Sequence, residues 1–300
     1  MFDSETTVQL LVCIFVTAGL YITWLLVRHV RAKRESGHPI TPRPIVLGIS
    51  SAATFLDTLG IGSFAPTTSA FRQWRLVPDE HMPGTLNVGY VIPTLLVAAI
   101  YIQSISVDAT TLIAMLVASV IGAWFGAGIV SHWPRRRIRI GMGIALLVAG
   151  LIMLLSQPQI ALLPSGGEAT GLHGLKLVVG VIGNFVLGAL MTLGIGLYAP
   201  CMILVYFLGL SPAAAFPIMM GSCALLMPVA SVRFLKAGSF SSGAVVGMAL
   251  TGIPAVLVAA LLVKSLPLVG LKWLVIVIVT YTAIALLRSA RFKLSKEVAL

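Results

Sequence analysis

The sequence predicts an all-α polytopic membrane protein, built from an inverted repeat and preceded by one extra N-terminal transmembrane helix. The first observation is composition: hydrophobic residues make up 58% of the 300 residues, charged residues 10%, and the mean hydropathy is +1.04. Soluble domains are nearer half apolar and a quarter charged. The second is a motif, TLGIG-x-aromatic-AP, that occurs at 58–66 and again at 192–200. The third is that most basic residues lie in short loops beside apolar segments.

Seven apolar segments are each long enough to cross a hydrocarbon core of about 30 Å as a helix. No soluble domain of useful size fits between them. The first segment is preceded by acids and followed by RHVRAKR, so it is interpreted as a retained first helix with its N-terminus outside. The predicted spans are 8–28, 83–104, 107–131, 138–156, 211–235, 241–263 and 271–288.

Two further regions, 44–74 and 175–209, carry the two copies of the motif near their centres. If each region turns back inside the membrane, all but three of the 20 basic residues lie on the cytoplasmic side, and the C-terminus is inside. If 44–74 crossed instead, Arg72, Arg75 and the arginines around 135–139 would lie outside. The positive-inside rule therefore favours two re-entrant hairpins. The three exceptions are Lys176, Lys264 and Lys272.

The first hairpin starts from inside and the second from outside, so the two halves are predicted to be inverted. Inverted repeats with paired broken helices are typical of secondary transporters, which bind substrate near the membrane midplane between the repeats. The sequence divides into an N-terminal helix and cytoplasmic loop (1–43), a first repeat (44–156), an external linker (157–174), a second repeat (175–290) and a cytoplasmic tail (291–300).

Each motif is predicted to end one half-helix and begin another inside the membrane. Its glycines allow backbone conformations that other residues resist, and its proline suits the first turn of a helix. We expect the second half-helices to begin at about Thr67 and Cys201, with unpaired N–H groups and positive dipole ends that attract an anion. Alternatively, these residues only allow tight packing or kinks. The glycines are Gly60, Gly62, Gly194 and Gly196, and the prolines are Pro66 and Pro200.

The paired Gly-x-Gly motifs followed by proline, the string DTLGIGSFAP at 57–66, and the stretch GLSPAAAFPIMMGSCALLMPVASVRFLKAGSF at 209–240 resemble the TauE/SafE family of sulfite and organosulfonate exporters. The resemblance covers about 44–290. It implies export of sulfite, sulfoacetate or a related small sulfur-containing anion across a bacterial or archaeal plasma (inner) membrane. The glycine-rich triplet often seen in the family is Gly-Ser-Phe and Gly-Leu-Tyr here, which leaves the substrate open.

Asp57 immediately precedes the first break and is the only acid that this scheme buries near the midplane. Intramembrane carboxylates are costly and usually functional. Asp57 is either a proton carrier for coupling or an acceptor of backbone N–H bonds that holds the hairpin. Ser63, Thr67 and Thr68 offer hydroxyls near the dipole end. Cys201, the counterpart of Thr67, is interpreted as a polarizable wall residue rather than a nucleophile, because no base lies nearby in the sequence.

Polar residues in the long helices extend the predicted site. Asn87 and Ser222, at or near related positions, either donate hydrogen bonds to an oxyanion or join helices, and Asn184 is a weaker candidate. Arg72 either draws anions into a cytoplasmic vestibule or contacts lipid headgroups. The predicted substrate-binding residues are Gly62, Ser63, Pro66, Thr67, Thr68, Asn87, Gly196, Pro200, Cys201 and Ser222.

These patterns predict a transporter and not an enzyme. The sequence contains no metal-ligand spacing, no nucleotide-binding loop and no catalytic constellation, so no cofactor or metal is expected. The net charge of +11 is assigned to membrane topology and not to nucleic-acid binding. The expected partners are the lipid bilayer and a small sulfur-containing anion, with proton coupling and a homodimer as options. The alternatives are an anion channel, or a transporter of another small anion such as a carboxylate.

Overall fold

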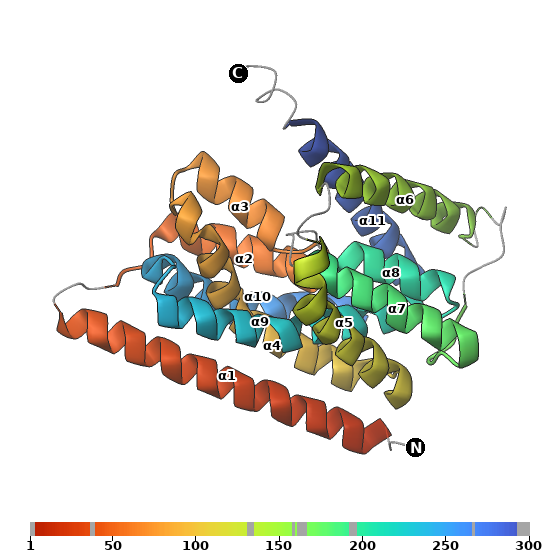
Figure 1. The fold of residues 1–300 in the computed structure, drawn as a ribbon, viewed down its shortest axis with the longest axis horizontal. Helices are drawn as coiled ribbons and strands as arrows, with labels where there is room; N and C mark the ends of the chain where they lie inside the picture. Colours follow the sequence, from red (N-terminus) through yellow and green to blue (C-terminus); the bar gives the residue numbers. More distant parts are fainter. Residues whose placement is uncertain are drawn as a thin grey trace. The chain divides into compact units, whose positions relative to one another are not determined.

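The computed structural model describes residues 4–36, 40–130, 135–157, 160, 167–191, 197–265 and 268–292. These residues form eleven α-helices and two short 3-10 helices (Figure 1). The α-helices are α1 (Ser4–Glu35), α2 (Pro44–Thr58), α3 (Phe64–Gln73), α4 (Met82–Ser104), α5 (Ala109–Val130), α6 (Arg135–Leu155), α7 (Gly174–Met191), α8 (Tyr198–Phe207), α9 (Ala215–Ala237), α10 (Ser242–Ser265) and α11 (Leu268–Phe292), and the 3-10 helices are η1 (Asp79–His81) and η2 (Pro212–Ala214).

Each of the seven predicted spans coincides with a long helix, namely α1, α4, α5, α6, α9, α10 and α11. Among the described residues, six helices are long and apolar enough to cross a membrane: α1, α4, α6, α7, α9 and α10. The chain is therefore a multi-pass membrane protein, as predicted. Helix α7, with 18 residues, is among the six although we predicted it as half of a hairpin. The number of spans and their orientation stay predictions.

The order of elements repeats along the chain. The series α2, α3, η1, α4, α5, α6 is followed by α7, α8, η2, α9, α10, α11. Helices α3 and α8 both have 10 residues and begin 134 positions apart, at Phe64 and Tyr198. Helices α4 and α9 both have 23 residues and begin 133 positions apart, at Met82 and Ala215. This recurrence supports an internal repeat, while its inversion across the membrane stays a prediction.

The chain forms two compact units, and each draws helices from both halves of the sequence. The first-break unit comprises 2–104 and 223–265, and the second-break unit comprises chiefly 105–222 and 266–300. In the first-break unit, α10 packs against α2 and α4, and α1 packs against α4. In the second-break unit, α5 packs against α7 and α6 packs against α11 (Figure 1). Helices α5 and α10 thus each pack against the hairpin of the other predicted repeat.

Equivalent polar residues hold these two exchanged helices. The Ser50 hydroxyl of α2 lies 2.8 Å from the Thr251 hydroxyl of α10. In the second-break unit, the Asn184 side-chain amide of α7 donates to the Met115 carbonyl of α5 at 2.7 Å. Ser50 and Asn184 are 134 positions apart, the offset of the motif. The same position of each hairpin therefore binds the helix that crosses over from the other half.

Glycines allow α5 and α7 to approach closely. A Cβ atom added at Gly122 would overlap the carbonyl oxygen of Phe185, and one added at Gly188 would overlap the carbonyl oxygen of Ser119. Because the obstacles are backbone atoms, no side-chain rotation would relieve either overlap. Small residues at helix contacts are typical of membrane proteins, where dispersion contacts replace much of the hydrophobic driving force.

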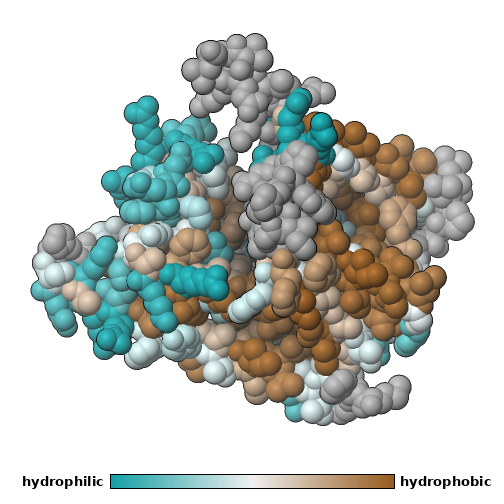
Figure 2. Space-filling view, viewed as in Figure 1, coloured by the Kyte–Doolittle hydropathy of each residue, from teal (hydrophilic) through white to brown (hydrophobic). Residues whose placement is uncertain are grey.

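Large apolar side chains are exposed on several long helices. Leu20 and Trp24 on α1, Leu175 on α7 and Leu261 on α10 each expose more than half of their surface. Figure 2 shows apolar residues at the surface over α7 and α8, and hydrophilic residues over α3. An apolar surface of this kind is covered by lipid in a membrane.

Candidate functional site: the break between α2 and α3

The first motif ends α2 with a glycine-based cap. The Gly60 N–H donates to the Asp57 carbonyl at 2.8 Å, and the Ile61 N–H donates to the Leu56 carbonyl at 3.0 Å. This pair of bonds is the Schellman arrangement, which needs a left-handed residue just after the helix. Gly60 has φ +98° and Gly62 has φ +90°. Both glycines of the first motif therefore adopt the backbone conformation that the motif predicts.

Helix α3 begins at Phe64, three residues before the predicted start at Thr67. Pro66 is its third residue, a position in the first turn where a missing N–H breaks no intrahelical bond. The Thr67 N–H donates to the Ser63 carbonyl at 3.1 Å, so this N–H is paired within the helix. The prediction of an unpaired N–H at Thr67 is wrong. The first-turn donors that lack an intrahelical acceptor are those of Phe64 and Ala65.

The second short helix shows the same correction. Helix α8 begins at Tyr198 and not at Cys201, and Pro200 is its third residue. The Cys201 N–H donates to the Leu197 carbonyl at 3.0 Å. The predicted glycines of this copy, Gly194 and Gly196, lie outside the described residues.

Asp57 connects the two sides of the first break. Its Oδ1 accepts a hydrogen bond of 2.7 Å from the backbone N–H of Ser63, which caps α3. The Asp57 side chain is buried, with 7% of its surface exposed. This contact is the one expected if Asp57 holds the hairpin. Its role as a proton carrier stays a prediction.

Two tyrosines of α4 contact the break, and neither was predicted from the sequence. The Thr67 hydroxyl shares a short hydrogen bond with the Tyr90 hydroxyl, and the Tyr101 hydroxyl donates to the Thr58 carbonyl at 2.8 Å. Tyr90, Tyr101 and Thr67 are almost fully buried. A tyrosine hydroxyl within an apolar span needs a polar partner. The presence of tyrosine in the apolar segment that forms α4 is therefore the sequence signal that could have identified both residues.

The other predicted residues of the first-break unit lie apart from these contacts. Thr68 is half-buried beside Thr67 on α3. The Asn87 amide donates to the Pro83 carbonyl of its own helix at 2.9 Å. Arg72 forms an exposed ion pair of 2.7 Å with Asp79. One N–H of the Asn87 amide is thus used within α4, and the Arg72 guanidinium is paired with Asp79.

In the second-break unit, Ser222 contacts Asn184. The Asn184 Nδ2 donates to the Ser222 hydroxyl at 3.2 Å as well as to α5. Within the described residues, the buried Asn184 Oδ1 has no hydrogen-bond partner. Cys201 is completely buried on α8. Asn184 and Ser222 thus join three helices, the structural alternative for both residues.

The described residues hold no group of three or more His, Cys, Asp or Glu side chains that could bind a metal ion. The sulfite exporter TauE/SafE family model matches residues 1–153, which include the first motif, α1–α5 and all but the last two residues of α6. This chain belongs to the sulfite exporter TauE/SafE family. No curated protein and no solved structure matches it.

Membership of the TauE/SafE family agrees with the resemblance found in the first motif. The family match covers about half of the chain, and the second motif lies beyond it. Together with the apolar helices, TauE/SafE membership identifies a multi-pass membrane transporter for a small anion.

Proposed function

We propose that this TauE/SafE protein is a secondary transporter that exports sulfite, sulfoacetate or a related organosulfonate across a bacterial or archaeal plasma membrane. Family membership supports the anion class. The observation that carries the mechanism is the break between α2 and α3, where the buried Thr67 of α3 contacts Tyr90 in the middle of α4. A homodimer stays a prediction.

The arrangement of the first hairpin supports a re-entrant path. Arg43, which precedes α2, and Leu76, which follows α3, line one pocket at the start of α2. After the break the chain therefore returns to the end of the hairpin at which α2 begins. Helices of 15 and 10 residues are about 22 and 15 Å long at 1.5 Å per residue, so neither alone crosses a core of about 30 Å. Tyr90, which contacts Thr67, lies in the middle third of the spanning helix α4.

The first turn of α3 supplies the groups that an anion needs. The N–H groups of Phe64 and Ala65 lie at the positive end of the helix dipole, and the Ser63 and Thr67 hydroxyls are beside them. The repeated motif extends the proposal to α8, whose first turn is proposed to supply the corresponding groups in the second-break unit. Anion binding by these N–H groups and hydroxyls requires no buried cation.

Asp57 gives a physical basis for proton coupling. Its carboxylate is bound to the N–H of Ser63, at the same break where the anion is proposed to bind. A bound anion and an ionised Asp57 repel one another, so anion binding favours a protonated Asp57. Coupling through this residue predicts that transport depends on pH and that this dependence is lost in Asp57→Asn.

Transport in proteoliposomes tests the function. Sulfite, thiosulfate, sulfoacetate and carboxylate analogues are each offered with and without an imposed proton gradient. We expect saturable transport of at least one sulfur oxyanion that an ion gradient drives uphill. A channel would pass the anion only downhill. If no sulfur oxyanion binds the purified protein, the substrate class is wrong.

Paired hydroxyl deletions on α3 test the site. Thr67→Val removes a buried hydroxyl at the break, whereas Ser69→Ala removes an exposed hydroxyl two residues away. We expect Thr67→Val to slow transport about tenfold, the effect of one lost hydrogen bond of about 1.4 kcal/mol, and Ser69→Ala to transport normally. Equal transport by both variants would exclude Thr67 from the site.

Cysteine labelling tests the path of the hairpin. In a background without native cysteines, single cysteines replace Ser36 after α1 and Gln73 at the end of α3, both of which are exposed. A re-entrant hairpin places both on the cytoplasmic face, so an impermeant thiol reagent labels both in inside-out vesicles and neither in intact cells. Labelling of the two positions from opposite sides would show that the hairpin crosses.

A further inference from the structure

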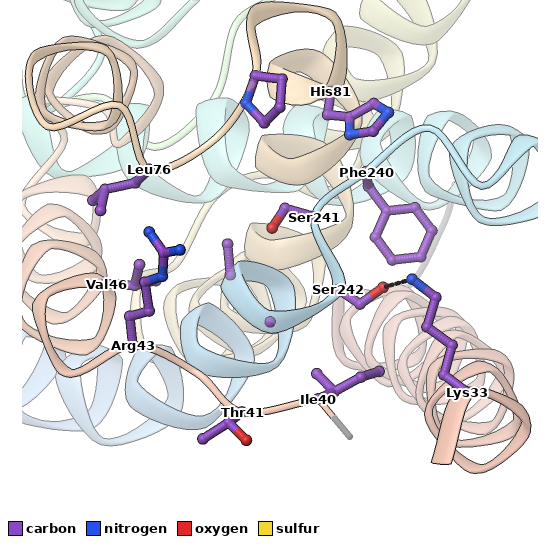
Figure 3. A pocket seen from close by; sticks show the side chains of 13 residues that line it. Lys33, Ile40, Thr41, Arg43, Val46, Leu76, His81, Phe240, Ser241 and Ser242 are labelled. Carbon is purple, nitrogen blue, oxygen red and sulfur yellow. Dashed lines mark hydrogen bonds between the residues drawn. The ribbon is translucent and has the colours of Figure 1, made fainter. Parts of the chain in front are cut away.

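A pocket of about 430 Å³ lies in the first-break unit at the start of α2 (Figure 3). Helix α2, which is about 22 Å long, separates the pocket from the break. The pocket is lined by residues from the end of α1, the start of α2, the segment between α3 and α4, and the turn between α9 and α10. Its lining residues are Lys33, Ile40, Thr41, Arg43, Val46, Leu76, Pro78, His81, Phe240, Ser241, Ser242, Gly243 and Ala244.

The charged residues of this pocket all carry the same sign. Lys33 and Arg43 come from two separate segments, the His81 imidazole lines the same pocket, and none of the lining residues is acidic. Within the described part of the chain, no carboxylate lies within 4.0 Å of the Lys33 or Arg43 cationic groups. Because like charges repel, the Lys33 and Arg43 side chains around one hollow are stabilised when an anion enters it.

Neutral hydrogen-bond donors accompany these charges. Figure 3 shows the Arg43 guanidinium and the Ser241 hydroxyl at the same hollow. Ser241 precedes the first residue of α10, so the first-turn N–H groups of Ser242 and Gly243 lie at the same place. A concave site thus presents a guanidinium, a hydroxyl and backbone donors together, a combination that matches the oxygens of a tetrahedral oxyanion.

Other contacts hold the donors in position before any ligand binds. The Thr85 hydroxyl of α4 accepts the Ser241 N–H at 2.9 Å. On the other side, Lys33 Nζ donates to the Ser242 hydroxyl at 3.0 Å, and His29 Nε2 lies 3.1 Å from the same oxygen. The turn before α10 is therefore tied to both α1 and α4, which lowers the ordering cost of binding.

We propose that this pocket binds a tetrahedral oxyanion of the phosphate or sulfonate type, held by Arg43, Lys33 and Ser241. The anion is either the headgroup phosphate of an acidic phospholipid or a soluble oxyanion. Basic pockets between membrane helices near the cytoplasmic surface are suited to acidic headgroups. The site is separate from the break and does not depend on the proposed export function.

Two binding measurements on the purified full-length protein distinguish the sources. In one, the protein is extracted from membranes that contain phosphatidylglycerol, and native mass spectrometry counts the phosphatidylglycerol that stays bound. In the other, delipidated protein in neutral detergent is titrated with inorganic phosphate and with sulfate by calorimetry. If only phosphatidylglycerol is retained, the pocket is a headgroup site. If only phosphate or sulfate binds in the titration, the ligand is a soluble oxyanion. Binding in both indicates one site open to either source.

Matched variants decide whether this pocket is responsible. Arg43→Gln and Ser241→Ala are expected to weaken binding about tenfold or more, the effect of losing one charge-assisted hydrogen bond. Arg34→Gln removes an equal charge next to Lys33 but outside the pocket lining, and is expected to bind normally. Thr67→Val, at the break, is expected to leave this binding unchanged. A failure of the export proposal is therefore distinguishable from a failure of the pocket proposal.

Two results would overturn the proposal. One is the absence of binding in both measurements with the wild-type protein. The other is a loss of binding in Arg34→Gln equal to that in Arg43→Gln, since this would show a general charge effect. If Arg43→Gln does not fold, as judged by circular dichroism, Ser241→Ala carries the comparison because it removes a single oxygen.

Discussion

Asp57 accepts a hydrogen bond from the backbone N–H of Ser63, so the last turn of α2 is joined directly to the cap of α3. A buried carboxylate in this position offsets part of its own desolvation and also fixes the angle at which α3 leaves the break. The same residue is the proposed proton carrier. The structural role and the proposed coupling role therefore concern the same side chain, and the choice of substitution separates them.

We predict that Asp57→Ala destabilises the protein by about 1.5–3 kcal/mol, because the Ser63 N–H loses a charged acceptor in a buried site. Asp57→Asn keeps an oxygen acceptor and is expected to cost less. Denaturant unfolding in detergent micelles measures both. If Asp57→Asn also transports without its normal pH dependence, the coupling role follows. Wild-type stability in Asp57→Ala would contradict the hairpin-holding role.

We predict that Gly60→Ala destabilises the first hairpin by about 1–2 kcal/mol, because an alanine at φ +98° is strained. Gly48→Ala, in the middle of α2, is the matched control: an added Cβ meets no atom within 4 Å there, and helix propensity favours alanine by about 1 kcal/mol. Thermal unfolding of the two variants is compared in the same detergent. A similar loss in both would show that α2 tolerates no alanine, irrespective of φ.

We predict energetic coupling between Thr67 and Tyr90. Thr67→Val leaves the buried Tyr90 hydroxyl without its partner and is expected to cost about 1–3 kcal/mol, as is Tyr90→Phe. The double variant removes both hydroxyls and leaves neither unsatisfied, so its cost is expected to be less than the sum. A double-mutant cycle of unfolding free energies measures this difference. Strict additivity would show that the hydrogen bond contributes nothing.

The long helices could be predicted because bilayer thickness sets their length, so an apolar run alone locates α4 or α10. The left-handed glycines of the first motif followed from their lack of a side chain. The start of α3 was misplaced by three residues because a proline fits any position of the first turn, and Pro66 is its third residue. The sequence pattern did not reveal which helices exchange partners, since this depends on close contacts such as that of Gly188 with Ser119.

The polar residues also include some whose role could be predicted from the sequence and some whose role could not. Asp57 could be identified from the sequence because a single carboxylate in an apolar region is costly and usually has a function. Asn87 was predicted either to donate to an oxyanion or to join helices. The hydrogen bond that its amide makes is within its own helix, and side-chain direction within a uniformly apolar helix has no periodic signal. Tyr90 was overlooked because tyrosine is counted as apolar, although its hydroxyl is the group that contacts Thr67.

We predict that the contact between α5 and α7 depends on glycine. Gly188→Ala places a Cβ against the backbone carbonyl of Ser119, so the helices must separate, at a cost of about 1–3 kcal/mol for overpacking. Gly122→Ala meets the carbonyl of Phe185 and is expected to behave alike. Gly141→Ala on α6 is the control, because an added Cβ has open space there. Unfolding midpoints in detergent test this, and a Gly188→Ala midpoint equal to that of Gly141→Ala would mean that α5 and α7 pack less closely than described.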